Sequence, residues 1–81
     1  MQYDIEIDAT GLLCPLPVLK LRKRMASLNS GSIIKMLADD PAAALDIPHF
    51  CNENKHFLLD TREPMQPNSN ESLRLYFIKK G

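Results

Sequence analysis

A cysteine followed by alternate prolines is the residue pattern in this sequence with the clearest chemical use. Cys14 precedes Pro15, Leu16 and Pro17, where a strand-like segment gives way to a helix-like one. Proline suits the first helical position, because its fixed φ matches a helix and its missing N–H would be unpaired there. We therefore expect a helix to begin at Pro15, with Cys14 at or next to its N-cap.

This position favours thiolate chemistry at Cys14. The thiolate is the nucleophilic form of cysteine, and a helix N-terminus offers about half a positive charge and unpaired N–H donors. Since Pro17 has no N–H, the amide of Leu16 is the expected donor to the sulfur. We predict an exposed, ordered thiol whose pKa is lowered. The alternative is a cysteine that only caps the helix or packs against it.

Apolar periodicity predicts the elements that position this thiol. Residues 3–8 alternate apolar and acidic side chains, which is typical of a strand with one buried face. The apolar face of that strand comprises Tyr3, Ile5 and Ile7. Gly11 allows the turn that follows. A helix is expected over residues 15–29, with an apolar stripe at helical spacing. The stripe comprises Val18, Leu21, Met25 and Leu28.

The rest of the chain predicts a second strand, a second helix and two more strands. A strand is expected over residues 32–38, followed by a helix with Asp40 as N-cap and Pro41 at its first position. Pro48 should break or kink this helix near Ile47. Further strands are expected over residues 56–61 and 72–79, with a loop over residues 64–70 between them. Apolar candidates for the sheet face opposite the helices are Ile33, Leu58 and Ile78.

The predicted order is therefore βαβαββ, in a single domain spanning residues 1–81. Two successive β–α units favour right-handed crossovers, so both helices should cover one face of the sheet. The result is a two-layer sandwich of the α+β class. Cys14 would emerge at the carboxyl end of the first strand, the edge where open α/β sheets usually bind ligands.

Composition limits the classes of function. The chain has 81 residues, ten basic and ten acidic, so its net charge is zero and general nucleic-acid binding is not expected. No secretory signal or membrane-length apolar run is evident, which predicts a cytoplasmic protein without membrane contact. Its two cysteines are expected to be free thiols. Cys51 fits a small buried side chain better than a resolving thiol. No metal site and no cofactor are expected, because zinc-ligand spacing is absent.

Basic residues gather on the predicted first helix. All five charged residues between positions 9 and 38 are basic, and four of them lie on that helix. These four are Lys20, Arg22, Lys23 and Arg24. They form either a simple solvated face or a docking surface beside the sulfur that steers an acidic partner.

The chain resembles the TusA/SirA family of small sulfur carriers. The resemblance begins with Asp8-Ala9-Thr10-Gly11-Leu12-Leu13-Cys14-Pro15-Leu16-Pro17 and continues through Ala38-Asp39-Asp40-Pro41. It extends through Asp46-Ile47-Pro48 and Phe50-Cys51 to the end of the chain. It implies a mixed four-stranded sheet of order 1-2-4-3, with the last strand antiparallel and two helices on one face.

The resemblance also implies a function, that of a sulfurtransferase or sulfur carrier acting through a cysteine persulfide. Cys14 would receive sulfur from a cysteine desulfurase or another donor and pass it to an acceptor protein. Routes in the family include 2-thiolation of tRNA uridine, molybdenum-cofactor assembly, sulfur oxidation and selenium metabolism. Asp8, Gly11 and the residues that follow Cys14 would shape the site, and Asp8 would hold the turn instead of acting as an acid. A regulatory or protein-interaction module that carries a thiol without transferring sulfur is the alternative.

Overall fold

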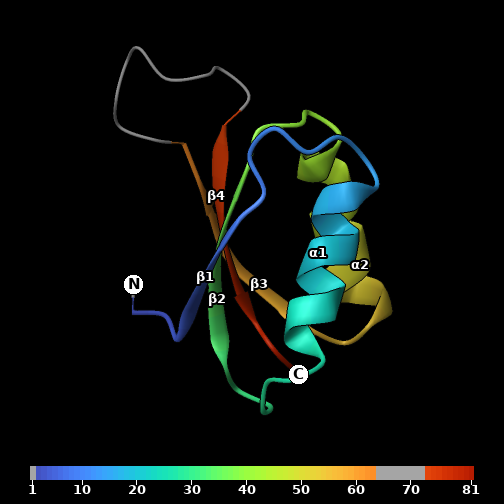
Figure 1. Ribbon diagram of the computed structural model, residues 1–81. Helices are drawn as coiled ribbons and strands as arrows, with labels where there is room; N and C mark the ends of the chain where they lie inside the picture. Colours follow the sequence, from blue (N-terminus) through green and yellow to red (C-terminus); the bar gives the residue numbers. More distant parts are fainter. Residues whose placement is uncertain (1, 64–72) are drawn as a thin grey trace.

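Strands and helices follow one another in the predicted order βαβαββ. The computed structural model describes residues 2–63 and 73–81, so the loop predicted over residues 64–70 lies outside the described residues. The elements are β1 (Ile5–Asp8), α1 (Leu16–Met25), β2 (Ile33–Ala38), α2 (Ala43–Glu53), β3 (Phe57–Arg62) and β4 (Arg74–Lys79). Both helices pack on one face of the sheet (Figure 1), which confirms the two-layer α+β fold.

The sheet has the order β1-β2-β4-β3. β1 pairs parallel with β2, whereas β4 is antiparallel to both of its neighbours, β2 and β3. The strand order and the antiparallel last strand implied by the resemblance are therefore confirmed. Because β1 and β2 are parallel neighbours, the loops that follow them leave the sheet at the same edge. Those loops carry Cys14 and the acidic pair Asp39 and Asp40.

The core lies between the helices and the sheet. Its largest fully buried side chains are Tyr76, Ile7, Leu21, Ile34, Met36, Ile47, Ile78 and Pro17. The expectation that Leu58 and Ile78 face away from the helices is wrong, because Ile78 is fully buried in this core and Leu58 packs against it. Ile34 pairs with Ile78, whereas Ile33 pairs with Lys79 on the next position of the ladder. Alternation along the strand therefore places only Ile33 of that trio on the outer face.

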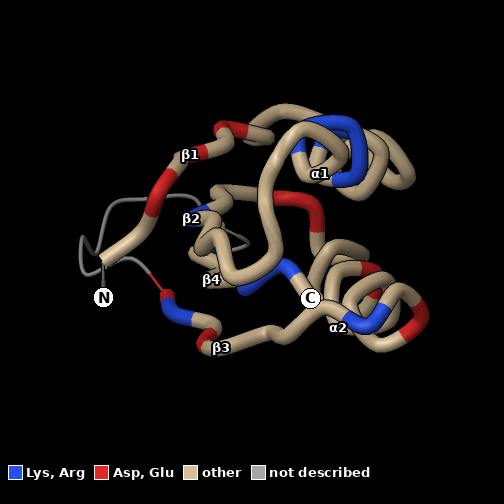
Figure 2. The backbone as a smooth tube through the Cα atoms, turned by 90° about the horizontal axis from the view of Figure 1, so that it is seen from below, with Lys and Arg blue, Asp and Glu red and all other residues tan. Residues whose placement is uncertain are grey.

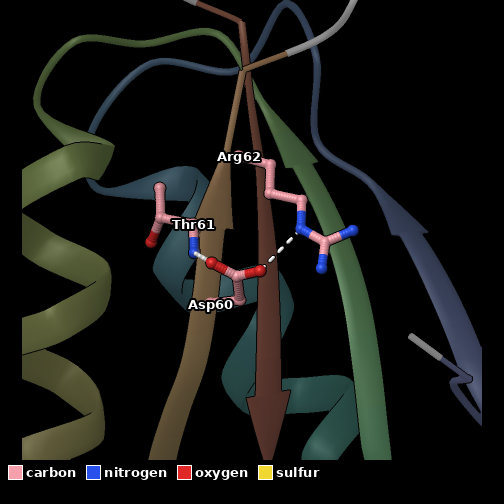
Figure 3. Close-up of polar contacts among 3 residues, drawn as sticks. All are labelled: Asp60, Thr61 and Arg62. Atoms are coloured by element: carbon pink, nitrogen blue, oxygen red, sulfur yellow. Dashed lines mark hydrogen bonds and ion pairs between the residues drawn. The ribbon is translucent and has the colours of Figure 1, made fainter.

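Aromatic and charged side chains cover the outer face of the sheet. Tyr3, predicted to share a buried face with Ile5 and Ile7, lies before β1 and contacts Phe77 with 6.5 Å between ring centroids. The Arg62 guanidinium lies 5.3 Å from the centroid of the Phe77 ring. Figure 3 shows Asp60 holding that guanidinium, with 2.6 Å between Nε and Oδ2. With these contacts Phe77 is only 4% exposed, on a face that neither α1 nor α2 covers.

A bulge in β3 explains the broken alternation at Leu58 and Leu59. Leu58 pairs with Ile78 on the helix side, but the next pair joins Asp60 to Phe77. Leu59 is the extra residue and is 41% exposed. An extra residue of this kind shifts the alternation of inward and outward side chains by one position beyond it. Asp60 is thereby placed on the outer face beside Arg62.

α1 ends at Met25, four residues before the predicted end. Beyond it, the Leu28 N–H donates to the carbonyl of Met25, which closes a tighter turn of three residues. The ammonium group of Lys80 donates to the carbonyls of Met25 and Leu28. A cation that satisfies terminal carbonyls ends a helix without further turns. Lys80, which directly follows β4, therefore helps to end α1 at Met25.

α2 is one continuous helix with Pro48 inside it, so the predicted break near Ile47 is wrong. The helix begins at Ala43, after a turn in which the Ala42 N–H donates to Asp40 Oδ1 at 3.2 Å. Ile47 is fully buried and Phe50 and Cys51 nearly so, and this burial holds the helix together across the proline. No helix within residues 2–63 and 73–81 is long and apolar enough to cross a membrane.

Candidate functional site

Polar contacts to Asp8 and Asp39 help to hold the loop after β1. Asp8 Oδ1 accepts the backbone N–H of Thr10 at 3.0 Å and its hydroxyl at 2.6 Å. These two contacts also lower the pKa of Asp8, because both stabilise the carboxylate. Gly11 has a φ of +80°, a backbone conformation that residues other than glycine rarely adopt. Its N–H donates to Asp39 Oδ1 at 2.9 Å. Asp8 and Gly11 thus shape the turn that leads to Cys14.

Cys14 is exposed, as predicted, and directly precedes the N-cap residue of α1. The first helical residue is Leu16 and Pro15 occupies the N-cap, so the helix begins one residue later than expected. The peptide bond between Cys14 and Pro15 is cis. Pro17 is buried at the second helical position. The Leu16 N–H donates to the carbonyl of Leu13 at 2.8 Å, so the expectation that it donates to the sulfur is wrong.

Two carboxylates from the second β–α unit hold Cys14. Its thiol donates to Asp46 Oδ2, with 2.8 Å between Sγ and the oxygen. Its backbone N–H donates to Asp40 Oδ2 at 2.5 Å. Asp46 lies in the first turn of α2. The cysteine therefore bridges the starts of both helices through its side chain and its backbone.

The prediction of a lowered pKa at Cys14 is wrong. The hydrogen bond to Asp46 raises the pKa of the thiol, and burial and the negative charges of Asp46 and Asp40 act in the same direction. Each of these effects disfavours a second negative charge on the sulfur. The group at rest is a neutral thiol that is exposed and held in one orientation.

A pocket of about 370 Å³ opens beside the sulfur, between the start of α1 and residues of α2. Its lining residues are Cys14, Pro15, Val18, Asp46, His49, Phe50, Glu53 and Asn54. Its size lies within the usual range of about 300–1,000 Å³ for ligand sites. The sulfur of Cys14 is therefore accessible from solvent through this opening.

The four basic residues lie elsewhere on α1. Lys20 donates to the backbone carbonyl of Asp8 at 2.6 Å and so braces the loop before the thiol. Arg22, Lys23 and Arg24 are exposed. None of the four is among the described residues that line the Cys14 pocket. Figure 2 shows Lys and Arg gathered on α1, and Asp and Glu on α2 and the segment before it.

Sequence reasoning missed the acidic surroundings of the sulfur. Asp39, Asp40 and Asp46 were recognised only as helix-start residues or as part of a family motif. The signal that could have revealed them is topological, because residues after neighbouring parallel strands meet at one edge of the sheet. His49 and Glu53 follow in the next turns of α2, and their side chains are in contact, with 3.4 Å between Nε2 and Oε1.

Cys51 lies apart from the site. It is 2% exposed in the core and does not line the Cys14 pocket. Burial raises the pKa of Cys51 to about 11, which keeps it a neutral thiol. Within the described residues, no group of three or more His, Cys, Asp or Glu side chains is placed to hold a metal ion.

Comparisons with known proteins identify the family of this chain. The family model described as sulfurtransferase TusA matches residues 5–76. The sulfur carrier protein TusA of Pseudomonas putida (strain GB-1) is 40% identical over 77 residues, which cover 95% of this chain and 89% of the relative. The protein of the same name from Pseudomonas entomophila (strain L48) is also 40% identical, over 96% of this chain and 90% of its own.

A solved structure supports the fold independently. The crystal structure of the SirA-like protein from Desulfitobacterium hafniense aligns with a TM-score of 0.73 at 23% identity, covering 96% of this chain and 99% of that one. At this identity the likeness concerns the fold alone. The family match and the curated relatives span the Cys14 motif and both helices, and on that evidence the chain belongs to the TusA family of sulfur carriers.

Proposed function

We propose that this protein carries sulfane sulfur as a persulfide on Cys14. It takes the sulfur from a cysteine desulfurase or another protein donor and passes it to an acceptor protein. The observation that carries the proposal is an exposed cysteine at the family's motif position, held in one orientation beside an open pocket. Membership of a family of sulfur carriers supports the same assignment.

The chemistry is thiol–disulfide exchange with one sulfur atom as cargo. Cys14 attacks the outer sulfur of the donor persulfide, a new S–S bond forms, and the donor cysteine leaves with the electron pair of the broken bond. An acceptor thiol then attacks the persulfide on Cys14 by the same step. The exchange is redox-neutral, so the protein needs no cofactor. Such transfers take place where thiols stay reduced, which supports a cytoplasmic location.

Partner docking is the second part of the proposal. The exposed basic residues Arg22, Lys23 and Arg24 on α1, together with Lys20, would attract an acidic surface on the donor or acceptor. Their separation from the Cys14 pocket suits this role, because a docking surface must leave the sulfur accessible. Direct binding of nucleic acid or membrane is not part of the proposal.

A sulfur-loading experiment tests the assignment of Cys14. Incubation with a cysteine desulfurase and radiolabelled cysteine should transfer one labelled sulfur per protein, released by a thiol reductant. We expect Cys14→Ser to carry no label, because its hydroxyl cannot form a persulfide. Cys51→Ser is the matched control, since it removes the other thiol, and should still be labelled. Equal labelling of Cys14→Ser and the wild type would refute the assignment.

The destination of the sulfur has its own test. We propose 2-thiouridine in tRNA as the end of the relay, following the family resemblance. Deletion of the gene should then lower 2-thiouridine in bulk tRNA, and wild-type protein but not Cys14→Ser should restore it. An unchanged 2-thiouridine content would assign the protein to another sulfur route while leaving the loading result intact.

A further inference from the structure

The contact between Cys14 and Asp46 is not explained by simple exchange through a free thiolate. The two residues are 32 positions apart in the chain, yet Sγ donates to Oδ2 at 2.8 Å. This contact is also the main reason that the pKa of the thiol is raised. A carboxylate that holds a nucleophile in its unreactive form slows the reaction, unless the same carboxylate accepts the proton when the nucleophile attacks.

We propose that Asp46 is a catalytic proton acceptor for Cys14, and that it relays the proton to the thiolate leaving the sulfur donor. The inference rests on the proposed sulfur-carrier function. It assigns the second group of the site, which the Cys-Pro-Leu-Pro motif does not contain. Carboxylates within hydrogen-bond reach of the transferred proton are established general bases.

The step balances in atoms, electrons and protons. Cys14 Sγ forms a bond to the outer sulfur of the donor persulfide as its proton moves to Asp46 Oδ2. The S–S bond of the donor breaks, and its electron pair stays on the donor cysteine. Asp46 then gives the proton to that thiolate. The products are a persulfide on Cys14, a neutral donor thiol and an ionised Asp46, with no oxidant or reductant consumed.

The pocket supports this assignment, because Cys14 and Asp46 line the same opening. A donor sulfur entering there meets the attacking sulfur and the carboxylate together. The other ionisable groups nearby are engaged differently. Asp40 accepts the backbone N–H groups of Cys14 and Ala42, and His49 is paired with Glu53 at 3.4 Å. Among the described residues, Asp46 is the carboxylate that contacts Sγ.

The test uses Asp46→Asn, which keeps the size of the side chain but cannot accept the proton. The donor is glutathione persulfide, which needs no protein docking surface, and single-turnover transfer is followed by intact mass spectrometry. We expect the rate near neutral pH to fall by about 100-fold, the lower end of the range for general acid–base groups. The carbon-13 shift of Cys14 should meanwhile titrate at lower pH than in the wild type, because a negative charge has been removed. More thiolate with slower transfer is a combination that simple loss of structure would not produce.

Two further variants make the result decisive. Asp60→Asn makes the same charge change on the outer face of the sheet and should alter neither the transfer rate nor the Cys14 titration. Asp46→Glu retains a carboxylate and should recover most of the lost rate, whereas equal losses in both Asp46 variants would indicate packing and overturn the relay.

The remaining outcomes separate the two proposals. Transfer by Asp46→Asn at or above the wild-type rate would show that Asp46 only suppresses the thiolate, and loss in His49→Gln alone would move the relay to His49. Either result overturns the inference while the carrier function stands. A wild-type protein that accepts no sulfur from glutathione persulfide or a desulfurase contradicts the carrier function itself.

Discussion

Two electrostatic effects of opposite sign meet at Cys14. The start of α1 supplies about half a positive charge, but its first helical residue lies two positions beyond the cysteine. Asp46 supplies a full negative charge with its oxygen 2.8 Å from Sγ. The hydrogen bond to Asp46, together with burial and the negative charges of Asp46 and Asp40, prevails, so the pKa of the thiol rises. Since oxidation of cysteine follows thiolate character, a carrier with this arrangement is protected while it is empty.

Another residue makes the stability of the fold depend on pH. Burial and the nearby charge of Lys80 lower the pKa of His56 below its ordinary value of about 6.5. Its Nδ1 accepts the Gly81 N–H at 3.0 Å, which a protonated Nδ1 could not do. The unfolded chain therefore binds the proton more readily. The stabilisation from neutral His56 is present above the unfolded pKa and is lost as pH falls through the folded one.

We predict that the free energy of unfolding declines as pH is lowered from about 7.5 to 5.5. Urea denaturation at a series of pH values measures this slope. His56→Gln removes the titrating group, so its slope should be flatter than that of the wild type. A slope that is the same in both proteins would exclude His56 as the cause.

At the scale of elements, the site is a junction between two β–α units. The loop after β1 supplies Gly11 and Cys14, and the segment after β2 supplies Asp39 and Asp40. Asp46 adds a contact from the first turn of α2. These three cross-links join segments that only the parallel pairing of β1 with β2 brings together. The geometry of the thiol is therefore a property of both units.

Pro48 gives a prediction about α2. Proline inside a helix lacks the N–H for a backbone bond, and its ring crowds the preceding turn. We expect Pro48→Ala to raise the free energy of unfolding by about 1–3 kcal/mol, measured by urea denaturation. Asn52→Ala, at an exposed position of the same helix, should change it by less than about 1 kcal/mol. A loss of stability in Pro48→Ala would show that the ring's packing outweighs the missing hydrogen bond.

At the scale of the whole molecule, zero net charge conceals a separation of charge. Lys and Arg gather on α1, and Asp and Glu on α2 and the segment before it, so the two helices that flank the pocket carry opposite charges (Figure 2). A partner that approaches Cys14 would therefore experience the positive potential of α1 and the negative potential of α2. Complementary charge of this kind acts mainly on the rate of association and on orientation.

Lys23 tests the docking surface, because it is exposed on α1 and does not line the Cys14 pocket. We predict that Lys23→Glu lowers the second-order rate of loading from a desulfurase by about tenfold at low salt. The difference should shrink as ionic strength rises, because added salt screens the interaction. Quenched-flow measurements of the loading rate over a series of salt concentrations test this prediction.

The control for this experiment is Lys79→Glu, which makes the same change at an exposed position on β4. Its loading rate should stay near that of the wild type. Both variants should accept sulfur from glutathione persulfide at the wild-type rate, because a small donor does not use the docking surface. Equal losses in the two variants would point to net charge and would exclude a specific role for α1.

The order of the elements, the two-layer fold and the place of Cys14 before a helix could all be predicted from the sequence. These features depend on short-range signals, namely apolar periodicity and the fixed φ of proline, which act within a few residues. The start of α1 was predicted to within one residue for the same reason. The residues on the outer face of β3 could not be predicted in this way, because the bulge in β3 depends on how that strand pairs with β4.

The chemistry around the sulfur was decided by tertiary structure. Cys14 meets Asp40 and Asp46 across 26 and 32 positions of the chain, and those contacts reverse the predicted direction of its pKa shift. A prediction from neighbouring residues includes only the effect of the helix that follows the cysteine on its pKa. The sequence alone thus determined which atom we propose as the carrier of the sulfur. The packing of two β–α units decided the charge state of that atom, because electrostatic effects depend on distance in space.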